Sequence, residues 1–301
     1  MSDSAGSCYG YDIRSKIPLR YLRRSGGEPL EVVTHRVECP TPDARLWEDW
    51  PAQENETVHV RTYLAGDTVQ MWFEGDGWFI VEPSRSRIAV PADHDDPVRL
   101  EERLFGMPVM LCFVARGDIP LHAAAVDTGH GALLIGAPSE HGKTTLSAGF
   151  WREGYRVLTE DLACIRLGDR AEVLPGPASL RLRQDVAAGM GMPTRPGAPN
   201  GARTRVPVLQ DDDDDDSSPV PLRGVVMLTG TGDEISLTPV PTVEAIRLIW
   251  ELVVTLEEPF DSSRCFAAVA DLASALPVWE LTRPMTLESL PKVVAELVAR
   301  A

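Results

Sequence analysis

The chain has 301 residues, of which 44% are hydrophobic and 25% are charged, a composition typical of a soluble globular protein. Its formal net charge of −16 makes it a poor candidate for binding a nucleic-acid backbone, so we expect no nucleic-acid partner. No apolar run approaches the roughly 20 residues of a membrane-spanning helix, so we expect no membrane partner.

The first residues, 1–9, contain no basic region followed by an apolar one, and the sequence therefore predicts no signal peptide. Cysteine usage also indicates a cytoplasmic protein. The cysteines are odd in number, scattered and without metal-binding spacing, at Cys8, Cys39, Cys112, Cys164 and Cys265. We expect reduced thiols and a cytoplasmic protein.

Residues 1–100 are predicted to form a β-rich N-terminal domain that carries no recognisable chemistry. Its clearest strands are predicted at 57–64, 68–73 and 77–81. The last two are expected to form a hairpin, because a Gly-Asp-Gly turn separates them.

Residues 101–301 are predicted to form an α/β domain whose C-terminal segments are helical. Its strands are expected at 121–126, 132–135, 155–159, 163–167, 171–174, 224–228 and 278–281. Its helices are expected at 144–152 and from Thr242, Ser263 and Pro291 onward, with Phe266 on an inward face. Residues 185–220 are rich in Gly, Pro, Ser and Asp and are predicted to be a long mobile loop.

Six consecutive aspartates, Asp211–Asp216, lie within this loop and leave a charge of −10 on the rest of the chain (−16 + 6). Such a run is typical of a solvated, disordered segment. Two alternatives remain open from the sequence: the run attracts a basic peptide substrate, or it collects metal ions.

The chemistry of the chain is concentrated after the strand at 132–135. Residues 137–144 fit the phosphate-binding pattern G-x-x-x-x-G-K-[ST] except at Ala137, which replaces the first Gly. In such a loop, backbone N–H groups and the following helix N-terminus bind phosphate oxygens. Lys143 would reach the β- and γ-phosphates, and the Thr144 hydroxyl would hold Mg²⁺. The predicted nucleotide-binding residues are Ala137, Pro138, Ser139, Glu140, His141, Gly142, Lys143, Thr144 and Thr145. The alternative is a chance strand-turn-helix.

Three further polar residues are expected at the same edge of the sheet. His122 precedes Lys143 by 21 residues, and Glu160 and Asp161 follow it by 17 and 18, after a predicted helix and strand. Mg²⁺ needs hard oxygen ligands, and phosphoryl transfer to an alcohol needs a group that accepts the hydroxyl proton. Two adjacent carboxylates can divide these tasks. The alternatives are a solvated turn for the acidic pair and a structural role for His122.

In this order of motifs, from His-Ala-Ala-Ala-Val through the phosphate loop to Gly-Tyr-Arg-Val-Leu-Thr-Glu-Asp, the chain resembles the HPr kinase/phosphorylase family of bacterial serine kinases. It is most similar to the short HPr-kinase-like proteins of peptide-modifying gene clusters, including those that phosphorylate lasso peptides. The resemblance covers about residues 100–301. It implies an α/β fold with a P-loop core of the HPr-kinase/PEP-carboxykinase type and a β-rich N-terminal domain.

The resemblance also implies an activity: an ATP- and Mg²⁺-dependent kinase for a Ser or Thr hydroxyl of a peptide or small protein, such as a ribosomal peptide precursor. Lys143 would clamp the phosphates, and Thr144 and Asp161 would bind Mg²⁺. Glu160 or Asp161 would be the base, with the other on the metal, and His122 would assist near the transferred group. Arg181 or Arg183 would neutralise developing charge. Homo-oligomers occur in the family.

The chain departs from the family pattern at Ala137, Glu140 and Glu160, where Gly, Gly and Asp are usual. Two alternative functions therefore stay open from the sequence. One is a kinase of a small metabolite alcohol, and the other is a degenerate nucleotide-binding or peptide-recruiting module without activity.

Overall fold

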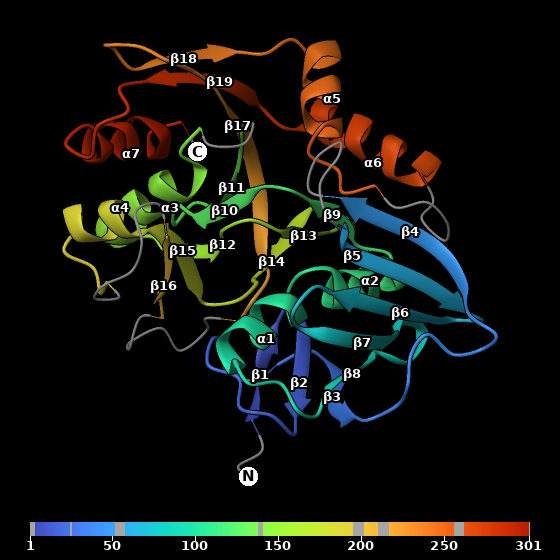
Figure 1. Cartoon of the computed structure of the whole chain (residues 1–301). Helices are drawn as coiled ribbons and strands as arrows, with labels where there is room; N and C mark the ends of the chain where they lie inside the picture. The colour runs from blue at the N-terminus through green and yellow to red at the C-terminus, as the bar shows by residue number, and fades with distance from the viewer. Residues whose placement is uncertain are drawn as a thin grey trace. The chain divides into compact units, whose positions relative to one another are not determined.

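The computed structural model describes residues 4–24, 26–51, 58–137, 141–194, 202–209, 217–255 and 262–300. The chain divides into two compact units, Met1–Asp118 and Ile119–Ala301 (Figure 1). Both combine strands with helices, so the protein is of mixed α/β type. In the described residues, no helix is both long and apolar enough to span a membrane.

The first unit is built on an eight-stranded sheet with the order β1-β2-β3-β8-β7-β6-β5-β4. Its strands are β1 (Ser4–Cys8), β2 (Tyr11–Ser15), β3 (Glu28–His35), β4 (Arg45–Pro51), β5 (Val58–Ala65), β6 (Thr68–Phe73), β7 (Gly77–Glu82) and β8 (Arg87–Pro91). The predicted hairpin is confirmed as β6 paired antiparallel with β7. Gly75 and Gly77 in its turn have φ of 74° and 86°, values that favour glycine.

The helical part of the first unit extends past the predicted boundary at residue 100. Its elements are the short 3₁₀ helix η1 (Pro83–Arg85) and the helices α1 (Pro97–Leu104) and α2 (Met107–Arg116). Phe113 of α2 packs on Tyr9 with ring centroids 5.3 Å apart, and the Arg116 guanidinium lies 4.0 Å from the Tyr11 ring centroid. These contacts attach α2 to the first unit, and the division of the chain follows Asp118.

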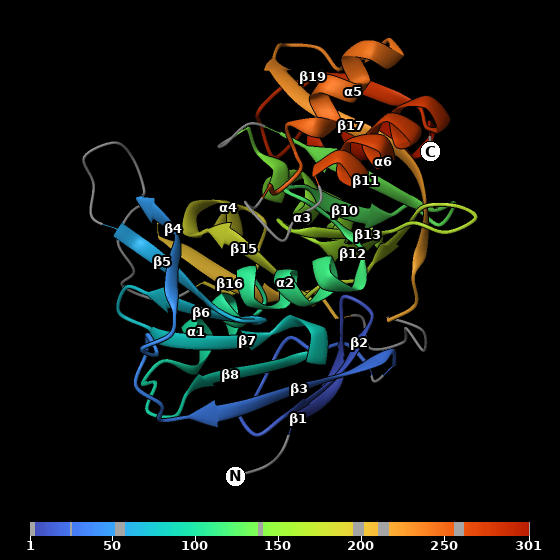
Figure 2. The same cartoon turned by 90° about the vertical axis from the view of Figure 1, so that its right-hand side faces the viewer.

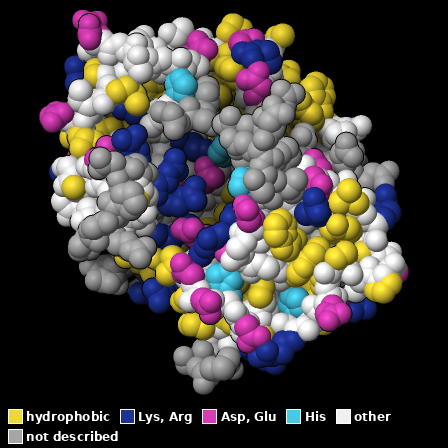
Figure 3. Space-filling model, in the orientation of Figure 1, with side chains coloured by type: hydrophobic (Ala, Val, Ile, Leu, Met, Phe, Trp, Pro, Cys, Tyr) yellow, Lys and Arg dark blue, Asp and Glu magenta, His cyan; other side chains and the backbone are white. Residues whose placement is uncertain are grey.

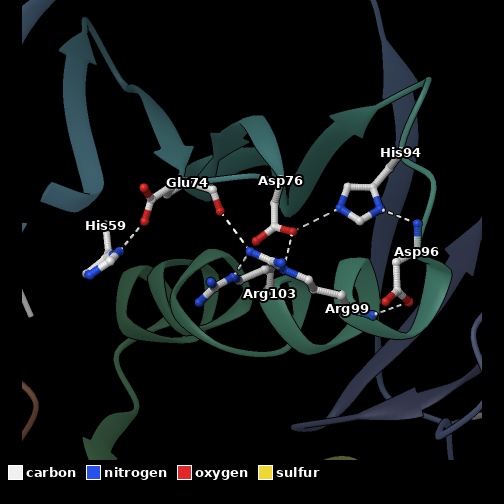
Figure 4. Close-up of polar contacts among 7 residues, drawn as sticks. All are labelled: His59, Glu74, Asp76, His94, Asp96, Arg99 and Arg103. Atoms are coloured by element: carbon white, nitrogen blue, oxygen red, sulfur yellow. Dashed lines mark hydrogen bonds and ion pairs between the residues drawn. The ribbon is translucent and has the colours of Figure 1, made fainter. Parts of the chain in front are cut away.

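The buried carboxylate of Asp76, in the β6–β7 turn, forms ion pairs with side chains of α1 (Figure 4). The Asp76 side chain has no exposed surface and lies 2.5 Å from Nε of Arg99, 2.8 Å from Nε of Arg103 and 3.1 Å from Nε2 of His94. Burial alone would raise the pKa of Asp76, but these three partners outweigh it and lower the pKa. Asp96 caps the same helix by accepting hydrogen bonds from the backbone N–H groups of its first turn.

The second unit contains a nine-stranded sheet, in which β12-β10-β11-β17-β14-β13-β9 form the main path and β19 pairs with β17 and β18. Its strands are β9 (Ile119–Leu121), β10 (Ala124–Asp127), β11 (Ala132–Gly136), β12 (Arg156–Thr159), β13 (Ala163–Arg166), β14 (Glu172–Leu174), β17 (Val220–Thr231), β18 (Ser236–Pro239) and β19 (Val278–Arg283), with β15 (Ser179–Arg183) and β16 (Arg203–Pro207) forming a separate two-stranded ribbon. Its helices are α3 (Lys143–Arg152), α4 (Gln184–Gly189), α5 (Thr242–Trp250), α6 (Ser262–Ala275) and α7 (Leu290–Val298).

Helices cover both faces of this sheet, with α3 and α7 on one side and α5 and α6 on the other (Figure 1); Figure 2 looks onto the side of α5 and α6. Along β11, Leu134 belongs to a core cluster with Ile249 of α5 and Val269 of α6, whereas Ile135 belongs to a second cluster with Phe150 of α3. Successive side chains of a strand point to opposite faces, so a strand covered on both sides is apolar throughout. This explains the uninterrupted apolar run before the phosphate loop.

Three predictions for this unit were wrong in detail. The strand expected at 121–126 is two strands, because the chain changes partners there. β9 pairs with β13, whereas β10 pairs with β11 and β12. The segment 185–220, expected to be a mobile loop, contains most of α4 and all of β16. Phe266, expected to face inward, is 50% exposed and contacts the Trp250 ring. The Asp run lies outside the described residues.

Candidate active site

The predicted phosphate loop connects the end of β11 to the start of α3. Gly142 has φ of 81° and is the N-cap of α3, so the conformation itself requires glycine. A Cβ on Gly142 would also lie 2.7 Å from Nη2 of Arg283. Lys143 is the first residue of the helix, and Thr144 and Thr145 follow in its first turn, where N–H groups have no partner inside the helix. Pro138, Ser139 and Glu140 lie outside the described residues.

Ala137 fits its position without backbone strain. Its φ is not in the left-handed region, where a Cβ would be unfavourable. Its side chain is 7% exposed and joins the core cluster that contains Phe150. The methyl group that replaces the usual hydrogen of glycine is therefore accommodated by packing.

The sheet topology brings the other predicted residues to the edge where the loop begins. β10 pairs antiparallel with both β11 and β12, so β11 and β12 end at the edge where β10 begins. His122 comes just before β10, and Glu160 and Asp161 come just after β12. The backbone N–H of His122 donates to Leu252 O at 2.6 Å and fixes the chain at this point.

Asp161 is the centre of the contacts at this edge. Its Oδ1 atom lies 3.1 Å from Nζ of Lys143 and 3.0 Å from Nε2 of His122. The structure thus brings together three of the predicted catalytic residues. An ionised carboxylate can only accept hydrogen bonds, so Nε2 of His122 carries the proton in this contact.

The surroundings of Asp161 favour its charged form. Burial alone would raise the pKa of Asp161, but the hydrogen bond from His122 and the charge of Lys143 outweigh it and hold the pKa well below its usual range. Because 61% of the side chain is exposed, solvent screens part of this effect. Asp161 is therefore ionised at neutral pH and open to a ligand.

Glu160 points elsewhere, as alternation along an extended chain requires. Its carboxylate accepts a hydrogen bond from the backbone N–H of Arg181 in β15. Burial raises the pKa of Glu160, and the charge of Arg205 opposes this only in part. The two acidic residues therefore differ in environment: Asp161 faces Lys143, and Glu160 connects the end of β12 to the β15–β16 ribbon.

The two arginines proposed from the sequence lie on this ribbon. The contact of Arg181 with the acidic pair is made by its backbone, and its side chain is exposed. The Arg183 guanidinium donates to Asp185 at 2.9 and 3.1 Å. Figure 3 shows several Lys and Arg side chains close together on the face that it draws.

Arg283 is a residue that the sequence reasoning missed. It ends β19, it is 2% exposed, and its Nη2 donates to Gly142 O of the phosphate loop at a long 3.4 Å. Nε is buried without a hydrogen-bond partner among the described residues. Burial lowers the pKa of Arg283. The sequence shows only that Arg283 lies two residues beyond the predicted strand at 278–281. The parallel pairing of this strand with β17, and of β17 with β11, brings it to the loop.

The residues at this edge of the sheet fit a nucleoside triphosphate and Mg²⁺. The Lys143 side chain is 10% exposed, and its buried Nζ has the ion pair with Asp161 but no well-aligned hydrogen bond in the described structure. Together with Arg283 and the start of α3, this cation makes the loop strongly attractive to phosphate. The Thr144 hydroxyl and Asp161 carboxylate are oxygen ligands of the kind that Mg²⁺ takes beside phosphates.

No family model and no curated protein matches the chain. A comparison with solved structures finds similarity to the HPr(Ser) kinase/phosphatase from Coxiella burnetii, with 11% sequence identity and a TM-score of 0.30, covering 60% of this chain and 93% of that chain. A similarity of this size carries no argument about activity, so function has to be argued from the site itself.

Proposed function

We propose that the protein is an ATP- and Mg²⁺-dependent kinase that phosphorylates a Ser or Thr hydroxyl of a peptide or small protein. The observation that carries this proposal is the contact of one carboxylate oxygen of Asp161 with both Lys143 and His122 at the start of α3. A phosphate-binding cation, a carboxylate and a ring N–H thus meet at one point, as phosphoryl transfer requires.

Each group has a defined task in the transfer. The acceptor hydroxyl oxygen forms a bond to the γ-phosphorus while the bond to the bridging oxygen of ADP breaks, and the hydroxyl proton passes to a carboxylate. Asp161 orients the hydroxyl and accepts its proton, since it lies beside Lys143. Lys143 binds the phosphates, and His122 holds Asp161 in place through its Nε2–H.

Thr144 would hold Mg²⁺ together with phosphate oxygens and water, and the ion would supply charge neutralisation of the phosphate oxygens, while Asp161 stays available for the hydroxyl proton. Glu160 acts differently in this proposal. Because its carboxylate binds the Arg181 backbone N–H, it positions the β15–β16 ribbon rather than the reacting atoms.

The openness of the site favours a peptide over a small metabolite. The side chains of His122 and Asp161 are 51% and 61% exposed. A site for a small metabolite encloses most of the ligand surface, whereas a peptide brings its own surface to cover the reacting groups.

The test is calorimetry with Mg-ATP, followed by transfer of labelled γ-phosphate to serine- and threonine-containing peptides. We expect wild type to bind and transfer, and Lys143→Ala to lose both. Lys292→Ala is the matched control, because Lys292 is an exposed lysine on α7. Absence of Mg-ATP binding in wild type, or transfer by Lys143→Ala at the wild-type rate, would refute the proposal.

A further inference from the structure

The β15–β16 ribbon carries a regular array of arginines on one face. The antiparallel register places Arg181 opposite Arg205 and Arg183 opposite Arg203. Residues of a strand that are two apart point to the same side, and residues directly opposite share that side. The four guanidinium groups therefore form two successive rungs, each with two positive charges.

The opposite face of the ribbon is apolar and anchored in the core. Leu180, Leu182 and Val206 are at most 2% exposed and belong to the cluster that contains Phe150. This packing fixes which face is turned outward. Arg181 and Arg203 are exposed, and neither side chain forms an ion pair among the described residues, although the charge of Arg181 acts on Glu160.

The chain compensates this array only in part, since Asp185 pairs with Arg183 and the Glu160 carboxylate lies near Arg205. Like charges directly opposite on neighbouring strands destabilise the pair. Here the arrangement occurs twice in succession, in a chain whose formal net charge is −16. A local concentration of positive charge on an acidic protein attracts an anionic ligand to this place.

The array begins next to the candidate active site. Glu160 binds the Arg181 backbone N–H, and Asp161 is the next residue in the chain. The first rung therefore lies beside the acidic pair, and the second rung lies about 6.6–6.8 Å further along the ribbon, at two residues of strand rise.

We propose that this face, the arginine ribbon formed by Arg181, Arg183, Arg203 and Arg205, binds an acidic, extended segment of the phosphate acceptor. The inference rests on the proposed kinase function and names its substrate class: a peptide with carboxylates at every second position near the reacting hydroxyl. An extended peptide repeats its side chains on one face every two residues, which is the spacing of the rungs. Arginine suits the task because its planar fork binds a carboxylate in two places.

The test measures peptide binding without nucleotide, by anisotropy of a fluorescein-labelled peptide. The probe has one serine in glycine spacers, with glutamates at the second and fourth positions on either side. One comparison peptide has glutamine in place of glutamate, and another has the same glutamates in adjacent pairs. We expect the alternating glutamate peptide to bind more tightly than both, with affinity falling steeply as salt rises.

Variants identify the surface. Arg181→Gln and Arg203→Gln are each expected to weaken binding of the alternating peptide about tenfold, in the range of a well-placed interface arginine. Arg170→Gln is the control and should leave it unchanged, because Arg170 is a 67% exposed arginine outside the ribbon. Arg203→Glu should bind a peptide with lysines in place of glutamates better than wild type does.

The outcomes separate this inference from the kinase proposal. If the acidic peptide binds through the ribbon but no phosphate is transferred, the inference about the surface stands and the kinase proposal fails. If phosphate is transferred but the glutamine peptide binds equally well, the inference fails and the kinase proposal stands. A rise in KM for ATP, with no change in KM for the peptide, in Arg203→Gln would assign the ribbon to nucleotide phosphates and overturn the inference.

Discussion

Replacing the buried arginine behind the phosphate loop should change stability and ligand affinity in opposite directions. Arg283→Met removes a charge from a site that is 2% exposed, and its flexible apolar side chain fills much of the same space. The hydrogen bonds that this substitution removes are long, 3.2 Å to Pro284 O and 3.4 Å to Gly142 O. We therefore expect relief of a buried charge rather than loss of a strong bond.

The magnitude follows from the cost of burying an ion. An unpaired buried ion costs several kcal/mol, and weak hydrogen bonds offset only part of this, so we expect Arg283→Met to gain about 1–3 kcal/mol. In a unit of this size each kcal/mol raises Tm by about 2–4 °C. The same change removes a cation beside the loop, and a charged hydrogen bond of about 1.5–3 kcal/mol corresponds to roughly 10- to 100-fold weaker binding of ATP.

The assay is a thermal melt of wild type and Arg283→Met, with and without Mg-ATP, together with calorimetric titration. Arg152→Met, at an exposed arginine in the last turn of α3, is the control and should leave ATP affinity unchanged. A lower Tm for Arg283→Met with unchanged ATP affinity would refute the reasoning, because it would make Arg283 a purely structural support of Gly142.

Four further predictions follow from the contacts described. Asp161→Asn should lower the transfer rate by about 10²–10⁴ while the protein still binds ATP, in a single-turnover assay; unchanged transfer would exclude Asp161 as the group beside the hydroxyl. Glu160→Gln should raise Tm at pH 7 and have little effect below pH 4. The folded-state pKa of Glu160 is raised, so the wild type loses stability as pH rises from the unfolded-state pKa through the folded-state pKa, and glutamine does not. Equal effects on Tm at both pH values would contradict this. Asp76→Asn should lower the free energy of unfolding by about 3–5 kcal/mol at pH values above the unfolded-state pKa, because it leaves Arg99 and Arg103 without their buried partner. This difference should shrink as pH falls through the lowered folded-state pKa of Asp76, and urea titrations at several pH values would measure it. Gly142→Ala should cost at least about 1–2 kcal/mol from its φ of 81° alone and should weaken nucleotide binding, and a wild-type melt with wild-type affinity would argue against the loop geometry.

Much of the second unit could be predicted from local patterns. The apolar run at 132–135 and the Gly-Lys-Thr that follows predicted a buried strand, a loop and a helix, and the structure has β11 and α3 at those places. The edge shared by His122, Lys143 and Asp161 could be predicted as well, because a strand, loop, helix and strand return the chain to the same end of a sheet. These inferences depend on neighbouring residues in the chain, where periodicity and turn chemistry are informative.

What could not be predicted depends on pairing between distant segments. Arg181 and Arg205 are 24 positions apart in the sequence (205 − 181), and only the register of β15 with β16 shows that they are neighbours. The intervening glycines and prolines favoured a loop over the strand that forms. Arg283 could not be connected with Gly142 from the sequence, because the contact depends on three parallel strands lying side by side.

β10 runs antiparallel to β11 and β12, and this arrangement bears on how the proposed acceptor preference could change between related proteins. The three groups of the site lie within two residues of a strand or at the first residue of a helix, so the hydrogen bonds of the sheet maintain their spacing. The arginine ribbon is a separate two-stranded element, which packs on α3 through its apolar face and donates one hydrogen bond to the acidic pair, at Glu160. In the proposed mechanism, chemistry and acceptor selection are thus carried by different parts of the unit. The charge pattern of the ribbon can be rewritten for a new peptide while the reacting groups remain in place.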